Sequence, residues 1–190
     1  MIYVTGTLGT SGAVLNRLRD GEKLRPKSHP KHFYPEPRVA VGEFLREKKL
    51  ASAMIDISDG LSTDLGHICD ESKVGAVVSA DSLPVAAENL VAGRFVSGHG
   101  FSRAASGTTI TGALAPEESS RRDDSHALAL HGGEEYELLF TARPDRRTPK
   151  QIAGVPITRI GEIVRGRQMK LMKADGRTEI LQPAGWEHFG

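Results

Sequence analysis

The sequence is short of cysteine, of aromatic side chains and of surplus charge, and each shortage narrows the possible functions. Its single cysteine, Cys69, cannot form an intrachain disulfide, which favours a reducing compartment. Six Phe, three Tyr and one Trp are too few for the stacking platforms of proteins that bind single-stranded nucleic acid. The net charge of +1 gives no general attraction for nucleic acid or an anionic membrane.

Long apolar stretches are missing as well. No apolar run approaches the roughly 18 residues that a membrane-spanning helix needs, and the first residues lack the basic-then-apolar order of a signal peptide. We therefore expect a cytoplasmic protein that binds neither a membrane nor nucleic acid. The chain of 190 residues is long enough to bury the core of one domain.

Hydrophobic periodicity predicts both strands and helices. Strands are expected at residues 2–4, 51–58, 74–80, 136–142 and 156–164, with a hairpin at 169–181. Helices are expected at residues 14–18, 41–45, 61–69, 85–93 and 148–154. This mixture predicts an α+β (α/β layered) fold, in which helices pack on the faces of a mixed β-sheet.

Two stretches interrupt this pattern. Residues 24–38 hold four prolines and show no period, which predicts an extended connection. Residues 97–125 are rich in Gly, Ser, Thr and charged side chains, so they bury too little apolar surface to offset their ordering entropy. We expect one domain over residues 1–190, with a flexible insertion at 97–125.

Two carboxylates and a hydroxyl lie where the strand at 51–58 gives way to the next helix. Asp56 falls at the carboxyl end of the strand and Asp59 falls in the first helical turn, so both can face one crevice. Carboxylate oxygens suit Mg²⁺, and Ser58 could donate to a phosphate. Taken alone, however, the stretch favours a simple helix cap by Ser58 or Asp59, with Asp56 bonded to backbone.

Glycine-rich stretches are similarly ambiguous when taken singly. "HGGEEYELLF", residues 131–140, would let a backbone approach a ligand closely, but a helix ended by glycine explains it as well. "GTLGTSG", residues 6–12, lacks the Lys-Ser/Thr ending of a phosphate-binding P-loop. His67 and His131 are expected to be structural, and no His and Cys cluster has the spacing of a zinc site.

The combination is more specific than its parts. In this order, the chain contains "IYVTGTLGTSGAVLNRL", "AMIDISDGLSTDLGHI", "ALHGGEEYELLFT", "ITRIGEIV" and "GWEHF". Together these blocks resemble the thiamine-monophosphate kinases, which belong to an ATP-binding superfamily with aminoimidazole ribonucleotide synthetase. The resemblance implies the fold of that synthetase's C-terminal domain. It also implies transfer of the ATP γ-phosphoryl group to thiamine monophosphate, giving thiamine diphosphate, with Mg²⁺ as cofactor and ATP as co-substrate.

The roles of single residues are implied by the resemblance alone. The matching positions imply that Asp56 and Asp59 hold Mg²⁺ and that Ser58 contacts ATP. Glu134 matches a residue that contacts the substrate, and Trp186 matches an aromatic residue packed near the thiamine. No residue is assigned as the catalytic group.

The chain also departs from the family pattern. The family has an N-terminal domain that carries further aspartates and most of the ATP site and forms a homodimer, and the matching blocks start after it. We therefore expect a C-terminal domain that is weak or inactive alone. The alternatives are a non-catalytic substrate-binding module and a related ATP-dependent synthetase with another acceptor. Glu135 stands where the family usually has Asp, and Phe189 is an alternative to Trp186.

Overall fold

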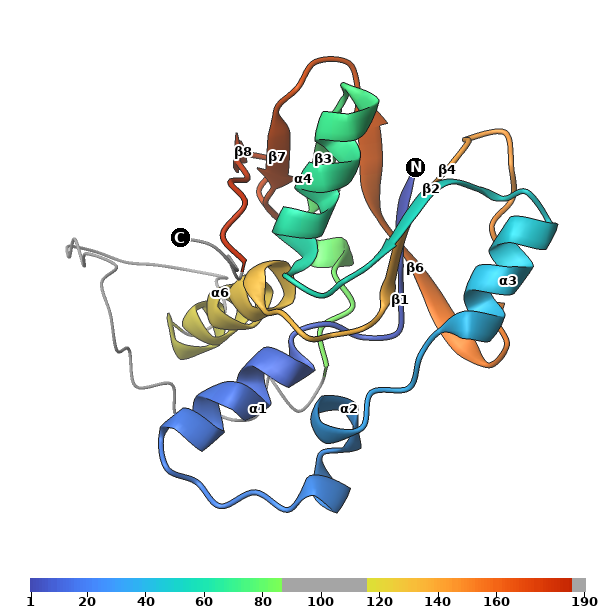
Figure 1. Ribbon diagram of the computed structural model, residues 1–190. Coiled ribbons are helices and arrows are strands. Elements are labelled where there is room, and N and C mark those ends of the chain that lie inside the picture. The colour runs from blue at the N-terminus through green and yellow to red at the C-terminus, as the bar shows by residue number, and fades with distance from the viewer. Residues whose placement is uncertain (87–115, 186–190) are drawn as a thin grey trace.

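A mixed β-sheet forms the centre of the computed structural model, which describes residues 1–86 and 116–185 (Figure 1). The strands are β1 (Ile2–Thr5), β2 (Ala51–Asp56), β3 (Gly75–Ser79), β4 (Leu138–Ala142), β5 (Gln151–Ile152), β6 (Val155–Val164), β7 (Met169–Met172) and β8 (Thr178–Ile180). Their order is β2-β4-β1-β6-β3-β7-β8, and β5 lies off this path and pairs with β6. The β3–β7 pair is parallel and the other pairs are antiparallel, so the predicted mixed sheet is confirmed.

Strand β6 joins the two halves of this sheet. It pairs with β1 at one end and with β3 at the other. At Gly161 the strands approach so closely that a Cβ atom would lie 2.1 Å from the carbonyl oxygen of Val77. A glycine is therefore required where β6 crosses from one partner to the other.

Helices cover the sheet on both faces. They are α1 (Thr10–Arg19), α2 (Pro30–Phe33), α3 (Val39–Glu47), α4 (Leu61–Ser72) and α6 (Pro116–His131), with short 3₁₀ turns η1 (Pro26–Ser28) and η2 (Ala80–Ser82). Figure 1 shows α4 and α6 on one side of the sheet and α3 on the other. None of the helices within the described ranges is both long and apolar enough to cross a membrane.

Each face of the sheet carries its own core. Leu65 of α4 packs in the larger core with Leu139, and Leu45 of α3 packs in the smaller one with Phe140. Leu139 and Phe140 are neighbours on β4 and are both fully buried. Successive strand residues point to opposite faces, so β4 contributes to both cores at once.

The structure differs from the sequence-based expectations in several connections. Residues 24–38 contain η1 and α2, each with proline at its start, rather than an extended connection. The predicted helix at 148–154 is wrong. Strand β5 turns there into β6 through Ala153 and Gly154, whose φ angles of 49° and 80° suit a two-residue hairpin.

The predicted insertion lies only partly within the described residues. Residues 97–115 lie outside them, whereas residues 116–125 belong to helix α6. Most of the helix predicted at 85–93 also lies outside the described residues, and at its start Val85 forms an isolated bridge with Leu8.

Candidate functional site

The turn between β2 and α4 is joined to the glycine-rich stretch that follows α6. Ile57 N–H donates to the carbonyl of Glu137 at 2.8 Å, and the Ile57 carbonyl accepts from Tyr136 N–H at 2.9 Å. The Ser58 carbonyl then accepts from Glu134 N–H at 2.8 Å. The ladder between β2 and β4 is thus extended by residues of both motifs. Two stretches separated by more than seventy positions become one site.

Close backbone contact explains two glycines at this junction. A Cβ atom on Gly60 would lie 3.0 Å from the backbone of His131, and Gly60 has a φ of 115°. A Cβ atom on Gly133 would lie 2.8 Å from the Ser58 carbonyl oxygen. These glycines let the two motifs pack against each other, which is a structural reason for their presence.

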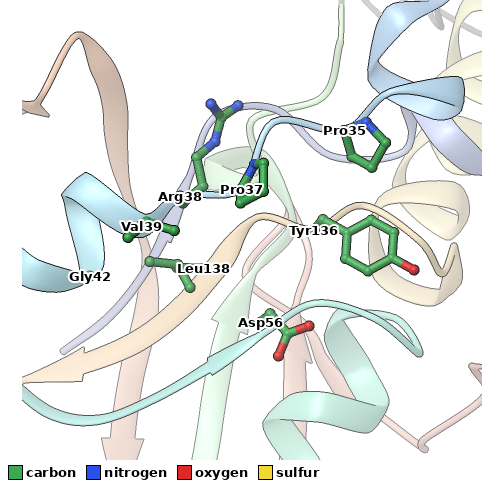
Figure 2. A pocket seen from close by; sticks show the side chains of 8 residues that line it. All are labelled: Pro35, Pro37, Arg38, Val39, Gly42, Asp56, Tyr136 and Leu138. Carbon is green, nitrogen blue, oxygen red and sulfur yellow. The ribbon is translucent and has the colours of Figure 1, made fainter.

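Asp56 ends strand β2 and lines a hollow of about 490 Å³. Figure 2 shows the hollow, whose walls come from the segment at 35–42, the end of β2 and residues 136–138. Tyr136 is 40% exposed and lines the same hollow. The hollow is mainly apolar, and Asp56 supplies a carboxylate at its edge.

Beneath this hollow lies a buried group of ion pairs. Glu137 accepts a hydrogen bond from Thr5 Oγ1 at 2.6 Å. It also accepts two from Arg38, whose Nε and Nη2 atoms donate at 2.8 and 2.9 Å. Glu135 accepts from Ser11 N–H at 3.0 Å, and its other oxygen lies 3.2 Å from Lys31 Nζ. The ion pairs of Lys31 and Arg38 with these glutamates thus connect the 24–38 segment to the residues that lead into β4.

The two buried glutamates differ in their pKa values. Burial acts to raise the pKa of Glu137, but the hydrogen bonds from Arg38 and Thr5 outweigh it and place that pKa below its ordinary value. Burial raises the pKa of Glu135, because the charge of Lys31 only partly offsets the loss of solvent. The charged form is therefore favoured at Glu137 and disfavoured at Glu135.

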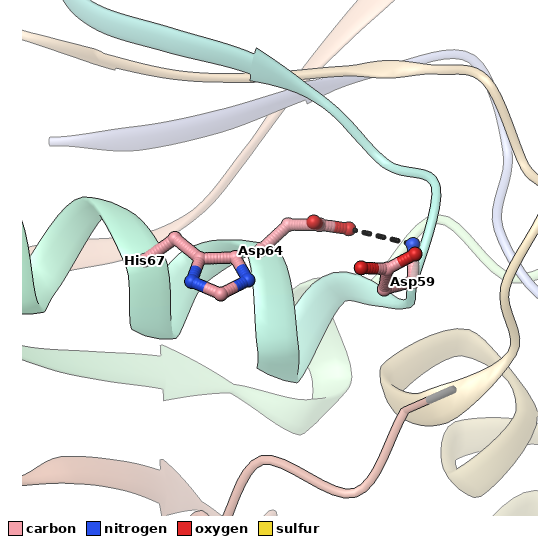
Figure 3. A group of neighbouring side chains, drawn as sticks. All are labelled: Asp59, Asp64 and His67. Atoms are coloured by element: carbon pink, nitrogen blue, oxygen red, sulfur yellow. Dashed lines mark hydrogen bonds between the residues drawn. The ribbon is translucent and has the colours of Figure 1, made fainter. Parts of the chain in front are cut away.

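Asp59 belongs to a second group, which contains Asp64 and His67 (Figure 3). One possible ligand atom from each side chain lies within 4.8 Å of the other two. Asp64 is 1% exposed, whereas His67 is exposed. Asp56 is not a member of this group, so the structure divides the two carboxylates of the "DISDG" stretch between two neighbouring features.

Asp64 holds the turn that carries Asp59. Its Oδ2 atom accepts from Ser58 N–H at 3.1 Å and from Asp59 N–H at 3.2 Å. Burial raises the pKa of Asp64 to about 6, although the N–H groups of Asp59, Gly60 and Ser58 favour its charged form. Two neighbouring carboxylates, one of them buried, fit a divalent cation, because the cation would offset both desolvation and repulsion.

The C-terminal segment reaches the same turn. Ala184 N–H donates to Ser62 Oγ at 3.3 Å, and Gly185 N–H donates to Thr63 Oγ1 at 3.0 Å. A Cβ atom on Gly185 would collide with the backbone of Asp59. Trp186 and Phe189 lie outside the described residues, so their predicted substrate contact remains a prediction.

The sequence analysis did not single out Asp64. The sequence nevertheless indicates a buried carboxylate at this position, because Asp64 lies on the same face of α4 as Leu61, Leu65 and Ile68, all of which are buried. An acidic residue within an apolar stripe must find hydrogen-bond donors. Glu134 was singled out, and the structure leaves its side chain exposed at the junction of the two motifs.

Comparisons with known proteins agree with this arrangement. Residues 1–173 match the family described as AIR synthase related protein, C-terminal domain. The thiamine-monophosphate kinase of Salmonella typhimurium is 36% identical over 201 residues, covering 99% of this chain and 52% of the relative. That of Haemophilus influenzae is 30% identical over 200 residues, covering 100% of this chain and 52% of the relative.

Solved structures show the same relationship. The thiamine-monophosphate kinase from Stenotrophomonas maltophilia matches with a TM-score of 0.68 and 32% identity, over 93% of this chain and 50% of that one. A structure described as AaThiL complexed with AMPPCP and TMP matches with a TM-score of 0.67 and 26% identity, over 99% and 50%. The chain spans about half the length of the curated relatives it matches. The resemblance in the sequence is thus confirmed, and the chain belongs to the family of AIR synthase related proteins, as their C-terminal domain.

Proposed function

We propose that this chain takes part in the ATP- and Mg²⁺-dependent phosphorylation of thiamine monophosphate to thiamine diphosphate. The observation that carries the proposal is its similarity, over nearly its whole length, to thiamine-monophosphate kinases. Because the chain spans about half of each relative, we propose that it contributes part of the kinase active site and does not carry out the complete reaction alone.

The residue types suit that share of the chemistry. Joining two phosphates brings anions together, so catalysis depends mainly on alignment and charge neutralisation. Bound Mg²⁺ would supply positive charge for the phosphates. Asp59 would hold the cation together with Asp56 at the adjacent strand end, and the Ser58 hydroxyl would donate to an ATP phosphate. The exposed carboxylate of Glu134 and the indole of Trp186 would face the cationic thiazolium ring of the substrate.

Calorimetry on the full chain tests this function. We expect thiamine monophosphate to bind, and ATP to bind more tightly when Mg²⁺ is present. Asp59→Asn should abolish the Mg²⁺-dependent part of ATP binding, because it removes a carboxylate ligand. Asp70→Asn is the matched control, since Asp70 is exposed on α4, the helix that follows the Asp59 turn. Absence of binding by both ligands, or equal effects of the two variants, would contradict the proposal. Chromatography of thiamine diphosphate measures any turnover.

We also infer that the protein works as a homodimer in the cytoplasm. Strand β2 lies at one end of the strand order, and no strand within residues 1–86 and 116–185 pairs with its outer edge. Such edges tend to acquire a partner. Cys69 is a free and buried thiol, which suits a reducing compartment. Light scattering after size-exclusion chromatography would test the dimer.

A further inference from the structure

Helix α4 begins without an ordinary cap. Its N-cap residue is Gly60, and no side chain at that position bonds to the first turn. The first N–H groups of a helix have no partner within the helix, and together with the helix dipole they usually attract an anion such as phosphate. In a protein proposed to handle ATP, the group that lies in front of this helix therefore affects how phosphate can approach.

The side chain of Asp64 reaches back from α4 to the turn in front of the helix. Its Oδ2 atom accepts from the N–H groups of Ser58 and Asp59, at 3.1 and 3.2 Å, and the N–H of Gly60 also favours its charged form. Successive N–H groups directed at one point form an anion-binding nest. Asp64 is 1% exposed, so its carboxylate fills this nest from within the protein.

Filling the nest changes the charge that the turn presents. The N–H groups of Ser58 and Asp59 are already bonded to Asp64, and the side chain of Asp59 lies beside the carboxylate of Asp64 (Figure 3). The outward charge of the turn in front of α4 is therefore negative. A phosphate would be repelled, whereas a cation would be attracted.

We propose that Asp64 is a positioning residue with two effects. Its carboxylate excludes phosphate from the nest of N–H groups in front of α4, and its hydrogen bonds fix the backbone of Ser58 and Asp59 so that Asp59 meets a divalent cation. Phosphate then reaches this turn through the cation and the Ser58 hydroxyl, not through the N–H groups of the nest. The identity of the cation as Mg²⁺ rests on the proposed function, but the filled nest does not.

Three variants of the full chain test the proposal. Asp64→Ala empties the nest, Asp64→Asn keeps an acceptor oxygen in it, and Asp70→Ala removes an exposed charge from the same helix as a control. The measurements are the NMR shifts of the Ser58 and Asp59 amides and calorimetric titrations with MgCl₂ and with sodium phosphate.

Asp64→Ala should shift both amide signals, weaken Mg²⁺ binding by roughly 10- to 100-fold and create a new phosphate site at millimolar concentration. Asp64→Asn should keep the amide signals near their wild-type positions, lose less Mg²⁺ affinity than Asp64→Ala and gain no phosphate site. Asp70→Ala should change none of these quantities.

The outcomes separate this inference from the proposed function. If the wild-type chain binds no Mg²⁺, the proposed function fails, while the amide shifts and phosphate binding still decide whether Asp64 fills the nest. Unchanged amides and unchanged phosphate affinity in Asp64→Ala would overturn the inference. If Asp64→Ala does not fold, Asp64→Asn provides the test. The inference expects the Ser58 and Asp59 amides of that variant to keep shifts near those of the wild type. Random-coil shifts of these amides would overturn the inference.

Discussion

Glu134 and Tyr136 both adopt left-handed backbone conformations, with φ angles of 59° and 50°. Residues with a Cβ atom rarely do so, and each such residue costs on the order of 1–3 kcal/mol. The alternate residues, Glu135 and Glu137, are buried. Glu135 makes an ion pair with Lys31, and Glu137 makes one with Arg38. The buried pairs hold the strained backbone in place, so Glu134 and Tyr136 remain directed towards solvent and the hollow.

A first prediction concerns the pair of Glu137 and Arg38. Glu137→Gln should lower the free energy of unfolding by about 3 kcal/mol, because it leaves a partly buried guanidinium without its charge partner. Urea denaturation measures the change. Glu162→Gln is the control, because its pair with Arg159 has side chains 52% and 53% exposed and should contribute less than about 1 kcal/mol. Equal losses in the two variants would show that burial does not strengthen the pair.

A second prediction concerns the thiol of Cys69. Burial raises the pKa of Cys69 to about 11, so the thiolate is scarce at pH 8, and the residue is only 2% exposed. A raised thiol pKa means that folding favours the neutral form of Cys69. In the folded chain, Ellman's reagent should react about 100-fold more slowly than in the urea-unfolded chain. Rapid reaction of the folded chain at pH 8 would be inconsistent with this burial.

At the scale of elements, the regular parts of the fold could be predicted and the turns could not. The apolar period of α4 identified its buried face, a short apolar run identified β3, and the strand predicted at residues 156–164 is β6. The β5–β6 hairpin escaped prediction because its turn depends on Ala153 at a positive φ, which is unusual for a residue with a side chain. Turn geometry depends on contacts made by residues distant in the sequence.

The same limit applies to the candidate site. The strand-to-helix transition placed Asp56 and Asp59 at a crevice, yet their separation into the hollow and the Asp64 group depends on how the chain turns between them. The residue types made metal and phosphate binding possible, but only the family resemblance favoured these roles over a simple helix cap. The role of Asp64 came only from the structure, since its hydrogen bonds go to backbone atoms of the turn.

A third prediction belongs to the turn itself. Gly60→Ala should lower the free energy of unfolding by about 2–4 kcal/mol, because the new Cβ atom meets the His131 backbone at 3.0 Å and the φ of 115° is unfavourable. Gly21→Ala is the control, with a φ of 83° and no atom of the described residues within 4 Å of its Cβ position, and should cost about 1–2 kcal/mol. A similar loss at both positions would mean that the contact with His131 is unimportant.

At the scale of the whole molecule, the proposed site straddles one end of the sheet. The Asp59 turn starts α4, which packs in the larger core, and the hollow beside Asp56 includes Val39 and Gly42 of α3, which packs in the smaller core. Movement of one face against the other would separate the two halves of the site. The sheet must therefore hold both faces together, and β4 and β6 each contribute buried side chains to both cores.

A fourth prediction follows from these shared strands. Leu65→Ala and Leu45→Ala each remove a fully buried side chain, one from each core, and each should lower the free energy of unfolding by about 2–5 kcal/mol. If the two faces unfold as one unit, NMR signals from α3 and α4 will disappear at the same urea concentration in the wild-type chain. Both variants will then shift the common midpoint without splitting the transition. Early loss of the α3 signals in Leu45→Ala, with α4 intact, would instead make the α3 face an independent unit, and the hollow beside Asp56 could then open while the Asp59 turn stayed in place.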